Sequence, residues 1–182
     1  MWCTDMNVLM TYSSGYGSTK EVAERISERL EEKSGFKLTL LSIDDVEDIS
    51  EYDAVIVGSS VRADRPLANV RDFFAKHINV LEKKHLAIFS VCLAANCQEG
   101  HEKVKREYIS QITDKYPKLE PLDTEAFGGK INFDQLNPVM QQLMKRVLQK
   151  TGIKTLGTVD TRDWDFIDSW AESLREQLAK AA

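Results

Sequence analysis

The chain has 182 residues, enough for one domain, and its 42% hydrophobic and 29% charged residues are ordinary for a soluble globular protein. A formal net charge of −5 argues against general nucleic-acid binding, which needs a basic surface, and no apolar run is long enough to cross a bilayer. Three widely spaced cysteines do not make a disulfide framework, so a reducing cytoplasm is expected. We therefore predict one cytoplasmic domain over residues 1–182, and the sequence indicates no oligomeric state.

The first element is a short apolar run over residues 7–12, which predicts a buried strand. Apolar residues at 22, 23, 26 and 30 predict a helix over residues 18–33. The turn between them directs backbone N–H groups and the positive end of the helix at one point, which favours an anion such as phosphate. We name this turn the phosphate loop, and its candidate binding residues are Ser14, Gly15, Tyr16, Gly17, Ser18 and Thr19. The alternative is a turn that only caps the helix.

The spacing within the phosphate loop separates it from two common motifs. The ATP-type loop requires a glycine directly before its lysine, but Thr19 precedes Lys20. The dinucleotide fingerprint requires a third glycine where Lys20 stands. What remains resembles the phosphate loop of flavodoxins, in which Gly17 and Thr19 take the usual positions while Gly15 and Tyr16 replace hydroxyl residues.

Further strands and helices alternate along the chain. Strands are predicted at 36–43, 53–58, 86–91 and 119–127, and helices from Pro66 onward and over about 99–116, whereas the acidic stretch 44–52 is interpreted as a solvated connection. This alternation indicates an α/β fold of three layers, in which a doubly wound parallel sheet of five strands has the flavodoxin-like order 2-1-3-4-5. Ligands of such sheets lie at the carboxyl ends of the strands, which selects residues 13–19, 58–65 and 90–98.

The second and third of these loops would flank the ring of FMN if the first loop held its phosphate. Neither loop contains an aromatic residue, so one face of the ring stays open, which suits an organic substrate better than a simple electron shuttle. Arg62 can stack on a ring or pair with a carboxylate, and it is the candidate for a catalytic role; the alternative is a solvent-exposed charge. The candidate ring contacts are Ser60, Val61, Arg62, Val91, Cys92, Leu93 and Ala94.

Other site chemistries are poorly supported by the sequence. Cys92, Cys97 and His101 lack the spacing and the fourth ligand of a metal site, so no metal is predicted. Whether Cys92 and Cys97 exchange electrons beside a flavin or are inert thiols stays open. A phosphoreceiver domain needs an aspartate after the third strand, where the chain has Gly58-Ser59.

The last third of the chain carries an insertion over roughly residues 128–158, followed by a final helix over about 164–180 that Asp163 is predicted to cap. Within the insertion, an amphipathic helix has basic residues in an otherwise acidic protein. Its apolar stripe either packs on the core or contacts a partner or a membrane surface. The stripe consists of Leu136, Met140, Leu143 and Val147, and the basic residues are Lys145, Arg146 and Lys150.

Four segments, 52–62, 90–93, 140–150 and 160–164, carry a closer resemblance, to the flavodoxin-domain family that contains menaquinone-dependent protoporphyrinogen oxidase. The resemblance implies that FMN accepts hydrogens from a porphyrinogen and passes electrons to a quinone in the membrane. It assigns residues 14–19 to the phosphate, and 60–62 and 91–94 to the ring. The alternative function is that of an electron-transfer flavodoxin, which docks redox partner proteins through its acidic surface and has no organic substrate.

Overall fold

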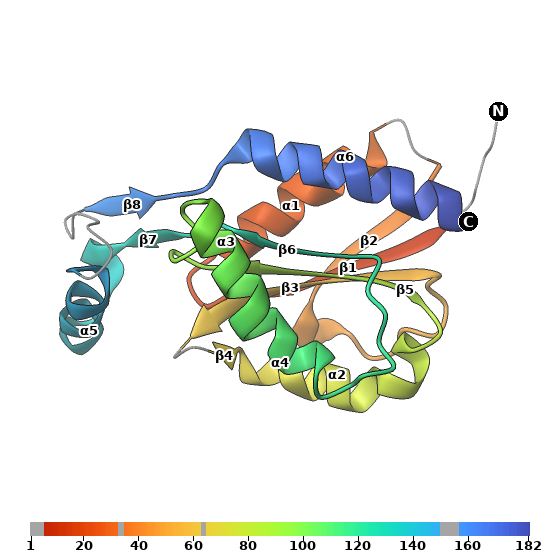
Figure 1. Cartoon of the computed structure of the whole chain (residues 1–182), viewed down its shortest axis with the longest axis horizontal. Coiled ribbons are helices and arrows are strands. Elements are labelled where there is room, and N and C mark those ends of the chain that lie inside the picture. Colours follow the sequence, from red (N-terminus) through yellow and green to blue (C-terminus); the bar gives the residue numbers. More distant parts are fainter. Residues whose placement is uncertain (1–5, 33–34, 63–64, 150–156) are drawn as a thin grey trace.

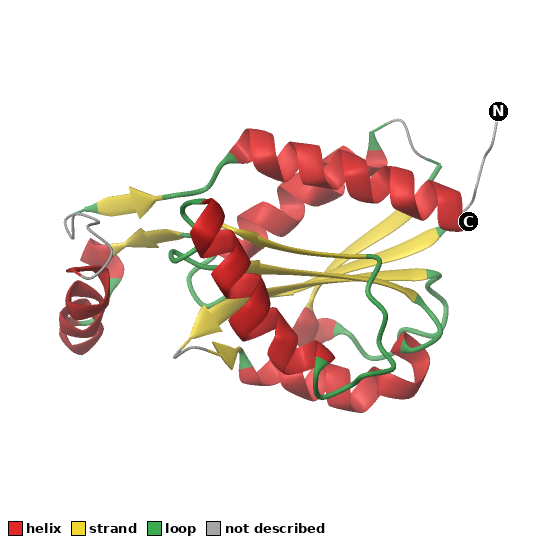
Figure 2. Ribbon diagram, in the orientation of Figure 1, coloured by secondary structure: helices red, strands yellow, loops and turns green. Residues whose placement is uncertain are grey.

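The computed structural model describes residues 6–32, 35–62, 65–149 and 157–182 as a twisted parallel sheet between two layers of helices (Figures 1 and 2). The main sheet has the order β2-β1-β3-β5-β6, so its five parallel strands, counted along the chain, follow the predicted order 2-1-3-4-5. The three-layer α/β prediction is confirmed. The strands are β1 (Asn7–Ser13), β2 (Lys37–Ser42), β3 (Ala54–Arg62), β5 (His85–Val91) and β6 (Asp123–Phe127).

Each face of the sheet buries one apolar cluster beneath its own helices. Val8 and Met10 of β1 pack toward α1 (Ser18–Glu31) and α6 (Trp164–Ala181), whereas Leu9 packs toward α2 (Ala68–Leu81). This division follows from the two-residue period of a strand, because neighbouring side chains point to opposite faces. The central strand β3 is apolar on both faces, and residues 54–57 have no exposed surface.

The third strand is longer than its apolar run indicates. β3 continues to Arg62 and pairs antiparallel with the short strand β4 (Arg65–Pro66), so the predicted strand end at residue 58 was wrong. The predicted helix start at Pro66 was also wrong, because Pro66 belongs to β4 and α2 begins at Ala68. A proline is compatible with such an edge position, where its missing N–H breaks no central ladder.

The acidic stretch between β2 and β3 is only partly the solvated connection that its composition indicates. A short 3₁₀ turn, η1 (Ile43–Asp45), opens it, and four apolar residues spaced three apart are buried on the α2 side of the sheet. The acidic side chains between them are exposed. The segment is therefore part of the core despite its charge. The buried residues are Ile43, Val46, Ile49 and Tyr52.

The predicted helix over 99–116 consists of three consecutive helical pieces. These are α3 (Gln98–Val104), the π-helical turn η2 (Lys105–Ile109) and α4 (Ser110–Thr113). Strand β6 then begins at Asp123, four residues later than predicted, after Pro121, which has no N–H for a ladder. Leu119, within the part predicted as strand, is nevertheless buried.

Beyond β6 the chain leaves the sheet on the side of its carboxyl ends (Figure 1). Strands β7 (Lys130–Asn132) and β8 (Thr158–Asp160) form an antiparallel ribbon that the sequence did not indicate, and the short turn η3 (Phe133–Gln135) and helix α5 (Pro138–Gln149) follow β7. A buried cluster of Ile131, Phe133 and Leu136 packs against Met140 and Met144 of α5.

This packing accounts for the described part of the amphipathic stripe of α5. The side chains of Leu143 and Val147, and the whole of Lys150, lie outside the described residues. At the start of α6 the predicted cap is confirmed, because the Asp163 carboxylate accepts a hydrogen bond from the Phe166 N–H at 3.0 Å. Within the described ranges, no helix has the length and apolar character needed to cross a bilayer.

Candidate functional site

The phosphate loop joins the end of β1 to the start of α1 through a left-handed residue. Gly17, the residue before the first helical turn, has a φ of 88°, a conformation that side chains disfavour, and its N–H donates to Ser14 Oγ at 2.9 Å. Among the described residues, no side chain caps the first turn of α1. Its leading N–H groups and the positive end of the helix are therefore open to an anion.

Thr19 gives a second reason to place an anion at this loop. The residue is fully buried, and its hydroxyl makes no hydrogen bond to any described residue. A buried hydroxyl without a partner costs roughly 1–3 kcal/mol, so such groups call for an explanation. A phosphate oxygen bound at the start of α1 would accept from this hydroxyl, and we conclude that the loop residues fit a phosphate group.

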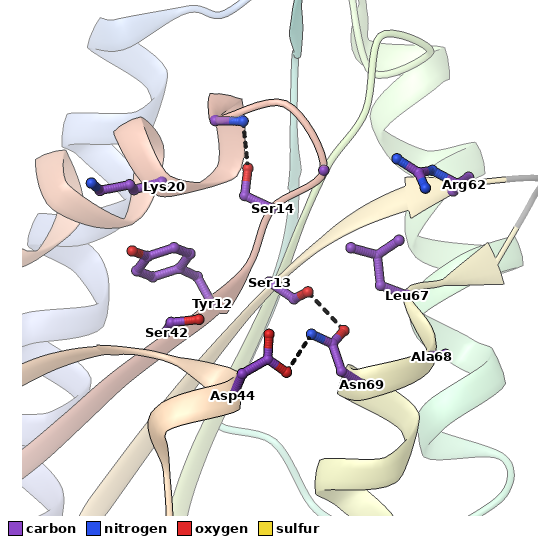
Figure 3. A pocket seen from close by; sticks show the side chains of 12 residues that line it. Tyr12, Ser13, Ser14, Lys20, Ser42, Asp44, Arg62, Leu67, Ala68 and Asn69 are labelled. Atoms are coloured by element: carbon purple, nitrogen blue, oxygen red, sulfur yellow. Dashed lines mark hydrogen bonds between the residues drawn. The ribbon is translucent and has the colours of Figure 1, made fainter. Parts of the chain in front are cut away.

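A cavity of about 620 Å³ lies beside the phosphate loop, at the carboxyl ends of β1 and β2 (Figure 3). It contains four of the predicted site residues, namely Ser14, Gly15, Gly17 and Arg62; Tyr16, Ser18 and Thr19 belong to the loop but do not line the cavity. The other lining residues were not among the candidate binding residues, although Ser13 lies in the selected loop 13–19: Tyr12, Ser13, Lys20, Ser42, Asp44, Leu67, Ala68 and Asn69.

The floor of this cavity is held by two consecutive hydrogen bonds. Ser13 Oγ donates to Asn69 Oδ1 at 2.7 Å, and Asn69 Nδ2 donates to Asp44 Oδ1 at 2.9 Å (Figure 3). They tie the end of β1 to the first turn of α2 and to the turn after β2. A signal for this arrangement exists in the predicted sheet order, which places the end of β2 next to the end of β1.

Arg62 reaches from the end of β3 across the phosphate loop. Its guanidinium carbon lies 5.6 Å from the centre of the Tyr16 ring, and a Cβ atom added to Gly15 would lie 2.9 Å from Arg62 Nη2. Gly15 therefore leaves the space that the arginine occupies. This geometry puts a cation next to the phosphate loop, where it favours a phosphate or a carboxylate. Its predicted role at a flavin or a substrate stays a prediction.

The remaining predicted ring contacts occupy different surroundings. Val61, Cys92 and Ala94 are partly buried, and we name these three residues the apolar shelf. They pack on a small buried cluster that includes Ala95 and Tyr108.

Leu93 packs instead on the inserted cluster around Phe133, and Ser60 Oγ lies 3.9 Å from the position of a Cβ at Gly15. Val91 as a whole is only 3% exposed and belongs to the buried cluster beneath α1 and α6. The structure thus separates the predicted contacts into a phosphate part, an apolar shelf and a part that touches the insertion.

The two cysteines of the third loop are not joined in a disulfide, and Cys97 is exposed while Cys92 is half-buried. His101, which follows them in the sequence, packs its ring against Phe166 at a centroid distance of 5.0 Å. The position of His101 is therefore explained by packing. A redox role for the thiols stays a prediction.

The sequence pattern of the flavodoxin domain matches residues 9–156, which is most of the chain. The chain belongs to the flavodoxin domain family. Its solved structural neighbours include oxidised flavodoxin 1 from Bacillus cereus, which is 18% identical with a TM-score of 0.52. The superposition covers 97% of this chain and 99% of that flavodoxin. Another is rubredoxin oxygen:oxidoreductase from Desulfovibrio gigas, with 16% identity, 97% and 37% covered, and a TM-score of 0.57. At these identities the neighbours support the fold alone.

Relatives of this flavodoxin domain include protoporphyrinogen IX dehydrogenase (quinone) of Escherichia coli K12, which is 22% identical over 177 residues, covering 93% of this chain and 94% of that protein. The protein of the same name from Leishmania major is 23% identical over 167 residues, covering 90% and 72%. The predicted resemblance to the family that contains protoporphyrinogen oxidases is confirmed. The flavodoxin domain is thus distantly similar to oxidoreductases, while its own substrate is a separate question.

Proposed function

We propose that this chain is an FMN-dependent oxidoreductase whose phosphate loop binds the phosphate of the flavin. The observation that carries the proposal is the buried, unpartnered hydroxyl of Thr19 at the start of α1, whose first turn has no side-chain cap among the described residues. A phosphate monoester satisfies the hydroxyl and the leading amides together. Membership of the flavodoxin domain family supports a flavin as the molecule that carries this phosphate.

The apolar shelf of Val61, Cys92 and Ala94 is the surface proposed for the flavin ring. Bound FMN supplies the redox chemistry that protein side chains lack, and the protein contributes orientation and electrostatics. The shelf offers half-buried apolar surface beside Ser60 and Arg62, which lie next to the phosphate loop. Since neither flanking loop has an aromatic side chain to cover the ring, an organic substrate has access to it.

For the substrate we propose dehydrogenation of a porphyrinogen, with electrons passed to a quinone. The support is the similarity to two protoporphyrinogen IX dehydrogenases over 90% or more of this chain. Arg62 is the proposed contact for a substrate carboxylate, because it is a cation that lines the cavity.

We place the protein in the cytoplasm, as one domain with residues 128–158 inserted. Lys145 and Arg146 of α5 are exposed, and we propose them as the contact with the membrane that holds the quinone.

A second candidate function is electron transfer between proteins without an organic substrate. It is favoured by the net charge of −5, which suits docking to a basic redox partner.

Spectra of the purified protein separate these functions. We expect a yellow protein, or a colourless one that becomes yellow on adding FMN. Bleaching by protoporphyrinogen and recovery with a quinone support the dehydrogenase, whereas electron exchange only with other redox proteins supports the second function. A protein that takes up no FMN at all contradicts both.

A further inference from the structure

The segment Asp160-Thr-Arg-Asp-Trp164 contributes to the family resemblance but has no part in the flavin site described above. At its centre, the Arg162 side chain is only 3% exposed. Its guanidinium donates two hydrogen bonds to the Asp160 carboxylate, from Nε to Oδ1 at 2.8 Å and from Nη2 to Oδ2 at 2.6 Å. The guanidinium carbon lies 4.5 Å from the centre of the Trp164 ring. A cation so deeply buried and so fully paired has a defined position.

The third partner of Arg162 belongs to the helix that carries the phosphate loop. Arg162 Nη1 donates to Glu21 Oε2 at 2.7 Å, across 141 residues of sequence. Glu21 lies in the first turn of α1, and its N–H donates to the carbonyl of Gly17 at 3.0 Å. The base of the β7–β8 ribbon is thereby attached to the start of α1.

Lys130 makes the same connection from the other strand of the ribbon. Its Nζ lies 3.4 Å from Glu21 Oε1, and its backbone N–H donates to Ser18 Oγ at 3.3 Å. Ser18 is one of the predicted phosphate-binding residues. Lys130 of β7 and Arg162, two residues after the end of β8, therefore both contact the first turn of α1.

The base of the ribbon also touches the third loop. The Thr161 hydroxyl donates to the carbonyl of Gly129 at 3.0 Å, and a Cβ atom added to Gly129 would lie 3.1 Å from the backbone nitrogen of Leu93. The ribbon base consequently lies between the phosphate loop and the loop that contributes Cys92 and Ala94 to the apolar shelf.

The charges in this cluster oppose an anion at the loop unless they are balanced. Glu21 is a carboxylate in the first turn of α1, next to the position proposed for the phosphate. The negative charges of the carboxylate and the phosphate would repel each other. The hydrogen bond from Arg162 lowers the pKa of Glu21 below its ordinary value, so the carboxylate stays charged at neutral pH. The two cations, Arg162 and Lys130, balance the two carboxylates, Glu21 and Asp160.

We propose that Arg162 is a positioning residue for the phosphate loop: it holds the Glu21 carboxylate away from the bound phosphate, neutralises its charge, and fixes the ribbon base against the first turn of α1. The inference rests on the proposed function in one respect, namely that the phosphate belongs to FMN. It goes further because it assigns an anion-binding role to residues outside the loop and the cavity.

The test compares FMN with riboflavin, which has the same ring but no phosphate, in fluorescence titrations. We expect Arg162→Met to weaken FMN binding by about fivefold, the upper end of the usual effect of a charge at a helix N-terminus, and to change riboflavin binding by less than about twofold. Glu21→Gln should tighten FMN binding, and the double variant Glu21→Gln with Arg162→Met should bind FMN within about threefold of Glu21→Gln alone.

Two further variants keep the outcome interpretable. Arg162→Lys retains the charge without the fork of bonds, so it should fold and lose less FMN affinity than Arg162→Met. Arg175→Met is the matched control, because the Arg175 guanidinium donates to the carbonyl of Glu32, at the opposite end of α1 from the phosphate loop; it should leave both affinities unchanged. Equal losses for FMN and riboflavin, or no rescue in the double variant, would overturn the proposal.

A wild-type protein that binds neither flavin contradicts the proposed function but still tests Arg162. In that case inorganic phosphate is the probe, and hydrogen exchange of the amides of residues 17–20 is the measurement. We expect phosphate to slow this exchange in the wild-type protein and to have a clearly smaller effect in Arg162→Met. Equal protection in the two proteins, or none in either, would overturn the role of Arg162.

Discussion

Replacing Thr19 with valine should have opposite effects on stability and on flavin binding. The Thr19 hydroxyl is buried without a hydrogen-bond partner in the described structure, and valine has nearly the same shape and the same branching at Cβ. Removing a buried, unsatisfied hydroxyl returns part of its roughly 1–3 kcal/mol desolvation cost, so the free energy of unfolding without flavin should rise by about 1 kcal/mol. Loss of a hydrogen bond to a charged phosphate should weaken FMN binding by about 1.5–3 kcal/mol, or roughly 10- to 150-fold.

Urea unfolding of the flavin-free protein and fluorescence titration with FMN measure the two effects separately. Thr11→Val is the matched control, because the Thr11 hydroxyl is also fully buried and also lacks a partner among the described residues, but it lies within β1 and outside the phosphate loop. We expect Thr11→Val to stabilise the protein without changing its affinity for FMN.

Two results would refute this reasoning. A Thr19→Val protein that is less stable, yet binds FMN with unchanged affinity, would mean that the hydroxyl has an internal role and that the phosphate binds elsewhere. Equal losses of FMN affinity in Thr11→Val and Thr19→Val would mean that the effect passes through the sheet and not through contact with phosphate.

Three further predictions concern stability. Gly58→Ala should lower the unfolding free energy by about 1–3 kcal/mol in urea titrations, because the new Cβ would lie 2.3 Å from the buried Phe89 ring; an unchanged midpoint would contradict this packing. Asp168→Asn should cost about 1 kcal/mol after solvent screening. The hydrogen bond from Arg29 lowers the pKa of Asp168 below its ordinary value of 3.8. The stabilisation by this ion pair is therefore present above pH 3.8 and is lost as the pH falls through the native pKa. Urea titrations of Asp168→Asn at several pH values should not show this loss. Burial lowers the pKa of His77, so stability should fall as pH drops from its ordinary value of 6.5 toward the native pKa, and thermal melts of His77→Leu should lack that slope.

The strand, turn and helix around the phosphate loop and the order of the sheet could be predicted from the sequence because their signals are local. The apolar run of β1, the helical period of α1 and the glycine at position 17, whose φ is 88°, lie within 25 residues of one another. The alternation of strands and helices then permits very few parallel topologies. Apolar patterns of this kind predict strands and helices without knowledge of any distant contact, because burial of an apolar face is the dominant favourable term in folding.

Contacts between distant segments could not be predicted in this way. The bond between Asp44 and Asn69, 25 residues apart, depends on how α2 meets the turn after β2. The sequence likewise did not place Arg162 against Glu21. Hydrogen bonds and ion pairs require distances near 3 Å and defined angles, and no periodic pattern encodes these for residues far apart in the chain. The sequence alone therefore determined the order of the sheet and the turn between β1 and α1, whose phosphate binding stays a prediction, whereas the tertiary structure decided which side chains line the cavity and contact this turn.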